Sequence, residues 1–107
     1  MANRLEHLLE FYRDDPHDAF TQYGIALEYN SQKNYPAALE WFERLRAAQP
    51  DYVPTYYMLA GVYRAVNEPR TAEEIYRAGQ IAAKKAGDHH AFAELSAALE
   101  ELLDDED

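Results

Sequence analysis

The stretch from Val53 to Ala86, VPTYYMLAGVYRAVNEPRTAEEIYRAGQIAAKKA, decides the fold because its pattern occurs twice in the chain. Moving the sequence back by 34 residues superposes similar residues, in the pairs Leu59 on Ile25, Ala60 on Ala26, Tyr63 on Tyr29, Ala72 on Ala38 and Tyr76 on Phe42. A fixed period of this size is typical of helical repeat proteins, in which each unit buries its apolar face against its neighbour. The sequence therefore predicts a small array of helix–turn–helix units.

The series of an aromatic residue, Leu-small, Tyr, Ala and a second aromatic residue resembles the tetratricopeptide repeat. The resemblance implies an all-α fold, a short right-handed α-solenoid of about six helices in antiparallel pairs. It divides the chain into a single domain, 1–103, and an acidic tail, 104–107; the domain holds full repeats at 19–52 and 53–86, a preceding half repeat and a capping helix at 88–103. Two residues depart from the family pattern. Gln22 replaces an aromatic residue, and Lys84 replaces the closing proline, which predicts a longer helix there.

Local signals place the helices within this frame. The apolar spacing from Leu5 to Tyr12 predicts a helix at 4–13, and Asp18 and Asn34 are expected to cap the next two, the second of them at about 35–48. Residues 52–66 contain the following helix. The long helix after it begins either at Pro69 or, by a capping-box pattern, at Thr71. Gly87 is expected to end that helix, and Asp88 to cap the last one, 89–103.

Small residues mark where the paired helices should touch. The resemblance places Ala26 against Ala38 in the first repeat and Ala60 near Ala72 in the second. A larger side chain at such a contact would overpack it.

Charge and composition exclude several classes of function. The chain carries 20 acidic and 10 basic residues, a net charge of −10, which argues against a nucleic-acid ligand because phosphates require a basic surface. It has no cysteine and no apolar run long enough to span a bilayer, so we expect a cytoplasmic protein that does not bind membranes. Six of the acids lie between Glu100 and Asp107. Such a run is expected to be a solvated tail, and a basic partner for it stays an alternative.

In the tetratricopeptide family the first helices of successive repeats line a concave groove. The resemblance carries this role to Phe20, Tyr23, Gly24, Leu27 and Asn30 of the first repeat and to Tyr57, Met58, Gly61 and Arg64 of the second. Tyr23 and Leu27 stand where the carboxylate-binding members have Lys and Asn, so a receptor for chaperone tails is not expected. Arg64 is expected to meet an acidic group of the ligand. For Tyr23 and Tyr57, ligand contact and internal packing are both open.

No catalytic or metal-binding pattern is present. The four glycines are far apart, and His89 and His90 are adjacent, so they would point in different directions on a helix. We therefore expect a non-enzymatic protein-interaction module without a cofactor, whose groove binds a protein or peptide segment. The alternative is a small acidic chaperone of the secretion type that holds a client segment. Self-association also stays open.

Overall fold

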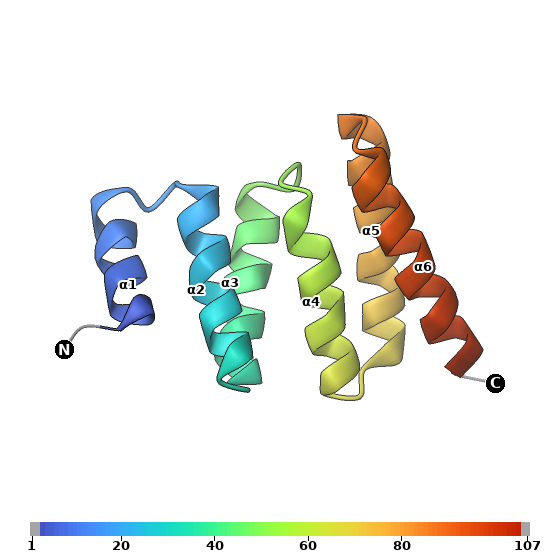
Figure 1. Cartoon of the computed structure of the whole chain (residues 1–107), viewed down its shortest axis with the longest axis horizontal. Coiled ribbons are helices and arrows are strands. Elements are labelled where there is room, and N and C mark those ends of the chain that lie inside the picture. Colours follow the sequence, from blue (N-terminus) through green and yellow to red (C-terminus); the bar gives the residue numbers. More distant parts are fainter. Residues whose placement is uncertain (1–2, 106–107) are drawn as a thin grey trace.

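The computed structural model describes residues 3–105, which form six α-helices and no strand. They are α1 (Arg4–Asp14), α2 (Ala19–Ser31), α3 (Tyr35–Ala48), α4 (Pro54–Ala65), α5 (Pro69–Ala86) and α6 (His89–Asp105). Figure 1 shows α2, α4 and α6 in front of α3 and α5, with the two ends of the chain at opposite ends of the row. The molecule measures 46 × 29 × 20 Å. The predicted all-α repeat solenoid is confirmed.

Polar side chains begin the helices of the first repeat as predicted. The carboxylate of Asp18 accepts a hydrogen bond from the backbone N–H of Thr21 at 3.0 Å, and Asn34 accepts from Ala37 at 3.4 Å. These bonds satisfy N–H groups that have no partner within the helix. In the second repeat, α5 begins at Pro69, and its N-terminus has no side-chain cap. The start at Thr71, which the capping-box pattern offered, is therefore wrong.

The helix α5 is longer than its counterpart α3, 18 residues against 14. Lys84 replaces the proline that follows α3, so α5 continues to Ala86, as expected. Gly87 then ends it with a left-handed backbone, φ 71°, a conformation that glycine adopts without steric cost. Asp88 caps α6 by accepting from the N–H of Ala91 at 3.0 Å.

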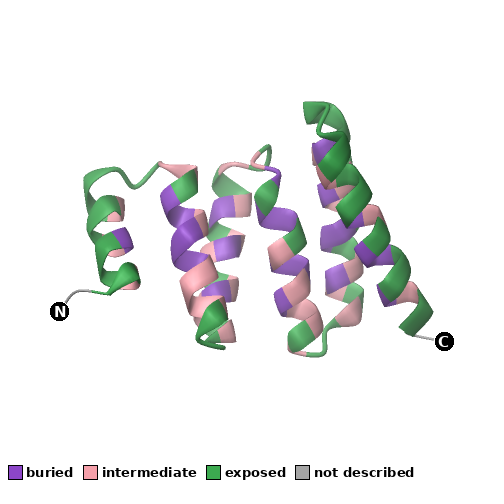
Figure 2. Ribbon diagram, in the orientation of Figure 1, coloured by how far each residue is buried: buried purple, intermediate pink, exposed green. Residues whose placement is uncertain are grey.

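The core lies between the two layers of helices. Ala26 and Ala38, and likewise Ala60 and Ala72, are fully buried, which agrees with their predicted place between paired helices. The large side chains around them are Phe42, Tyr76 and the aliphatic residues of α4 and α6. In Figure 2 the buried residues lie mainly on the helix faces that meet. Small residues at the contact let α2 approach α3, and α4 approach α5, closely.

The C-terminal helix extends further than predicted. It ends at Asp105 rather than 103, so Asp104 and Asp105 of the expected acidic tail are helical. Asp105 lies 3.4 Å from the guanidinium of Arg64 on α4, an ion pair that favours the additional residues of the helix. Glu106 and Asp107, the rest of the expected tail, lie outside the described residues, and the division into domain and tail stays a prediction.

Within residues 3–105, every helix is too short or too polar to cross a bilayer.

Candidate functional site

A cavity of about 370 Å³, here called the central pocket, lies where α2, α4 and α6 meet. Its apolar part contains Tyr23 from α2 and Tyr57 and Met58 from α4, three of the residues predicted to line the groove. Its remaining lining residues are Val53, Pro54, Asp88, His90, Ala91, Glu94 and Leu95. The fold thus brings together aromatic side chains from both repeats, 34 residues apart in the sequence.

The two tyrosines of the central pocket both pack internally and face the cavity. The ring of Tyr23 lies edge-on to Phe42, 6.0 Å between centroids, and to Tyr52, 5.9 Å. Burial raises the pKa of Tyr23, and the nearby Tyr52 and Glu94 raise it further. Tyr57 packs edge-on to Tyr76 at 6.4 Å while 44% of its surface stays exposed. The sequence left two roles open for these rings, internal packing and ligand contact. In the structure each ring packs against other aromatic side chains and also lines the pocket, so both roles are compatible with its position.

The other groove residues divide into two groups. Leu27, Asn30 and Gly61 are half-buried, and a Cβ atom at Gly61 would meet no atom within 4 Å, so this position is open. Gly24, by contrast, is buried against α1. A Cβ atom there would lie 3.2 Å from the Leu8 side chain. The expectation that Gly24 lines the groove is therefore wrong, and its small size serves the contact between α1 and α2.

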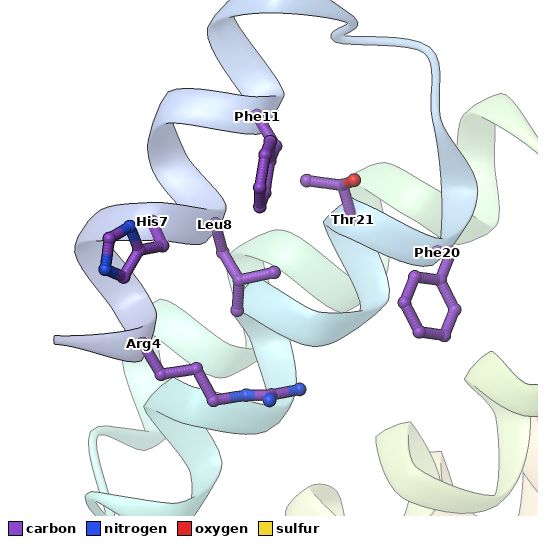
Figure 3. A pocket seen from close by; sticks show the side chains of 6 residues that line it. All are labelled: Arg4, His7, Leu8, Phe11, Phe20 and Thr21. Carbon is purple, nitrogen blue, oxygen red and sulfur yellow. The ribbon is translucent and has the colours of Figure 1, made fainter.

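Phe20 lies in a different depression, here called the N-terminal groove. This cavity of about 660 Å³ runs between α1 and α2 and is lined by Arg4, His7, Leu8, Phe11, Phe20 and Thr21. Figure 3 shows Leu8 and Phe11 on the α1 side and Phe20 on the α2 side, with Arg4 reaching toward α2. Phe11 and Phe20 are 60% and 69% exposed. Phe20 is one helical turn from Tyr23, so the N-terminal groove and the central pocket share one side of α2.

Arg64 already has two carboxylate partners within the chain. Its guanidinium lies 3.3 Å from Glu101 and 3.4 Å from Asp105, both on α6. The sequence expectation treated Arg64 as a cation available to an acidic ligand, and the structure departs from it. The difference arises because α6 packs beside α4 and continues to Asp105.

The acidic side of the central pocket was missed at the sequence level. Asp88, His90 and Glu94 come from the start of α6, and Glu94 lies 3.4 Å from His90. The apolar stripe of the last helix, Phe92, Leu95, Leu99 and Leu102, places Glu94 off the buried face, but it does not show which side chains Glu94 lies beside. Because α5 is longer than α3, the period does not carry over to α6. No local signal in the sequence indicates that Glu94 lines the same pocket as Tyr23 and Tyr57, because this depends on how α6 packs.

The chain resembles solved structures, although no family model and no curated protein matches it. A tetratricopeptide repeat domain protein from Salinibacter ruber, studied by solution NMR, is 35% identical, with 82% of this chain and 89% of that chain covered and a TM-score of 0.79. A crystal structure of a tetratricopeptide repeat domain protein from the same organism is 34% identical, covers 79% and 94%, and has a TM-score of 0.76.

A Bordetella parapertussis protein shares the fold at lower identity. It is 19% identical, covers 98% of this chain and 91% of that chain, and has a TM-score of 0.85. The repeated sequence pattern, the paired helices and the two structures from Salinibacter ruber lead to one conclusion. This chain belongs to the tetratricopeptide repeat family.

Proposed function

We propose that this chain is a non-enzymatic adaptor that binds a peptide or protein segment in an aromatic concave groove formed by α2, α4 and α6. The observation that carries the proposal is the central pocket, where Tyr23, Tyr57 and Met58 from two repeats line one cavity of about 370 Å³. A segment bound there would contact both repeats at once. Tyrosine supplies a large contact area at a small entropic cost and is enriched among residues that dominate binding energy.

The other proposed groove residues lie on the same helices. Leu27 and Asn30 follow Tyr23 on α2, and Gly61 follows Tyr57 on α4. Leu27 and Asn30 are half-buried, so part of each side chain is open to a ligand, and Gly61 leaves open space on α4. An extended segment lying across the repeats fits this arrangement better than a small molecule, because the lining residues spread over three helices.

A comparison of variants tests the adaptor function. The wild-type chain and Tyr57→Ala would serve as baits in a native lysate, and the partner retained by the wild type would then be purified and titrated. Removing an aromatic hot-spot side chain should weaken binding by about 30-fold or more. Ile81→Ala is the matched control, because Ile81 is an equally apolar residue, 72% exposed, on α5 in the other layer.

The outcome separates the groove from the rest of the surface. Loss of the partner with Tyr57→Ala but not with Ile81→Ala would support the groove. Equal retention by all three proteins, each with unchanged helical circular dichroism, would contradict it and direct attention to the other layer.

A second function, a chaperone that holds a client segment, is favoured by the N-terminal groove. Phe11 and Phe20 there are more exposed than Tyr57, the most exposed aromatic residue of the central pocket, and the cavity is larger, about 660 Å³. Exposed apolar surface of this kind marks interaction sites and tolerates many sequences. A chaperone should bind several unrelated apolar peptides with similar affinity, whereas an adaptor should prefer one. Measuring a panel of unrelated apolar peptides distinguishes the two functions.

A further inference from the structure

The central pocket has an apolar side and an acidic side. Tyr23, Tyr57 and Met58 form the first, from α2 and α4, and Asp88 and Glu94 of α6 form the second. Glu94 and Asp88 are exposed to solvent, so each carboxylate can accept hydrogen bonds from a ligand. The pocket thus places two carboxylates beside apolar side chains within one cavity.

The existing contacts of these carboxylates leave room for a cation. Asp88 uses one oxygen to accept from the N–H of Ala91, which leaves its second oxygen for another donor. Glu94 contacts His90 at 3.4 Å, and the His90 side chain is 87% exposed. Among residues 3–105, neither carboxylate forms an ion pair with a lysine or an arginine.

Carboxylates also outnumber basic groups along the rest of the face between α4 and α6. Arg64 is the cation that the groove positions supply, and two carboxylates, Glu101 and Asp105, already surround it. Counting Asp88 and Glu94, four carboxylates and one guanidinium border α6 on this side. An acidic ligand would meet repulsion along the whole of this side, whereas a basic one would be attracted to it.

We propose that the central pocket binds a peptide segment that places an apolar or aromatic side chain against Tyr23, Tyr57 and Met58, with an adjacent Lys or Arg beside Asp88 and Glu94. This inference rests on the proposed adaptor function, and it replaces the acidic ligand expected from Arg64 by a basic one. The exposed face of Tyr57 can add a cation–π contact to the same basic group. Charge complementarity selects the segment, and the apolar side chain anchors it.

Three matched peptides test the charge of the ligand: Gly-Leu-Trp-Lys-Lys-Gly, Gly-Leu-Trp-Glu-Glu-Gly and Gly-Leu-Trp-Gln-Gln-Gly, each amidated and acetylated. Binding would be measured by NMR titration of the backbone amides of α2, α4 and α6 at low and at high salt. The Lys peptide should bind about 3- to 10-fold more tightly than the Gln peptide, and the Glu peptide should bind least. The preference should shrink at high salt, because the contact is between partly exposed charges.

Variants assign the preference to the pocket. Glu94→Gln should reduce the preference for the Lys peptide over the Gln peptide by about 3-fold or more. Glu94→Lys should favour the Glu peptide over the Lys peptide. Glu74→Gln is the matched control, because it removes the same charge from an exposed position on α5 and should change nothing. Circular dichroism would confirm that each variant keeps its helices.

The outcomes separate this inference from the function on which it rests. If all three peptides shift the pocket amides with equal affinity, the groove binds peptides but the inferred basic ligand is wrong. If the Glu peptide binds most tightly, the inference is likewise overturned. If none of them shifts the pocket amides, both the inference and the groove as a peptide site fail. A Lys preference that Glu94→Gln reduces and Glu74→Gln leaves intact supports the proposal.

Discussion

The two repeats make the same hydrogen bond with different residues. In the second repeat the hydroxyl of Tyr56 donates to the carbonyl of Pro50, at 2.5 Å. In the first, 34 residues earlier, Gln22 Nε2 donates to the carbonyl of Pro16 at 2.9 Å. Gln22 departs from the family pattern, yet it is buried and donates to the equivalent acceptor. In both repeats, therefore, the carbonyl of the preceding proline accepts a side-chain hydrogen bond, although the residue that donates it differs.

The repeats differ more in the space between helices. Leu45 on α3 is fully buried, and its counterpart 34 residues later is Gly79 on α5. A Cβ atom at Gly79 would lie 2.6 Å from Tyr56 Cβ and 3.0 Å from Leu95 Cδ2. The first repeat accommodates a leucine where the second has no room for a methyl group. Equivalent sequence position therefore does not guarantee equivalent space, because Tyr56 of α4 and Leu95 of α6 both lie close to the backbone of α5 at Gly79.

The largest effect is expected from giving the second repeat the residue of the first. Gly79→Leu should destabilise the fold by about 3 kcal/mol or more, because the clash is with Cβ of Tyr56, an atom that cannot move without its backbone. Chemical denaturation followed by circular dichroism measures the loss. Gly61→Ala is the control. The added methyl group would meet no atom within 4 Å, so the higher helix propensity of alanine should raise the free energy of unfolding by about 0.5–1 kcal/mol. A Gly79→Leu variant as stable as the wild type would show that α4 and α6 can both move away from α5.

The next largest effect is expected at the buried alanines between paired helices, where the two repeats should behave alike. Ala26→Leu and Ala60→Leu each place a large side chain between paired helices at a fully buried position, and each should cost about 1–3 kcal/mol. Ala97→Leu, on the exposed side of α6, controls for the substitution itself and should have almost no effect. Thermal unfolding compares the three variants. If one repeat loses stability and the other does not, the two paired-helix contacts are not equivalent.

The sequence was sufficient to predict the helices because their signals are local or periodic. The caps at Asp18 and Asn34, the glycine stop at Gly87 and the repeated alanines each require only a few neighbouring residues to interpret. The long reach of α5 also followed from one residue, Lys84. These features determined the order of the elements and most of their ends.

The site could be predicted only in part because it depends on how α6 packs. The repeat pattern indicated Tyr23, Tyr57 and Met58, which do line one pocket. It could not indicate Glu94 or Asp88, because α6 does not follow the period, nor could it show that Glu101 and Asp105 pair with Arg64. Glu101 and Asp105 follow Arg64 by 37 and 41 positions in the sequence. Contacts between residues so far apart, on two helices separated by a third, leave no local pattern in a single sequence.

A smaller effect is expected from the shared hydrogen bond. Tyr56→Phe removes the hydroxyl that serves Pro50, and Gln22→Met removes the amide that serves Pro16, so each should cost about 1 kcal/mol. Equal losses would confirm that the two residues play one role. Tyr12→Phe is the control. Its ring packs on Trp41, and no hydrogen bond from its hydroxyl to another described residue is present, so denaturation should show little change.

The smallest effect concerns the turn within each repeat, where the backbone is the same and the residue differs. Lys33 and Asn67 both have a left-handed conformation, with φ 59° and 62°. The next residue donates a backbone hydrogen bond back across the turn in both repeats, from Asn34 to the Tyr29 carbonyl at 2.9 Å and from Glu68 to the Tyr63 carbonyl at 2.8 Å. A left-handed backbone is unfavourable for a lysine, whereas asparagine tolerates it.

Lys33→Asn should therefore stabilise the protein by roughly 0.5 kcal/mol, about 2–4 °C in melting temperature for a domain of this size. The reciprocal change, Asn67→Lys, should lower the melting temperature by a similar amount. Lys33→Gln is the matched control, because it removes the same charge without a preference for the left-handed conformation. If Lys33→Gln stabilises the protein as much as Lys33→Asn, charge rather than backbone conformation distinguishes the two turns. Opposite shifts from the two reciprocal changes, with no shift from the control, would show that both repeats form one turn and that the first carries the less suitable residue in it.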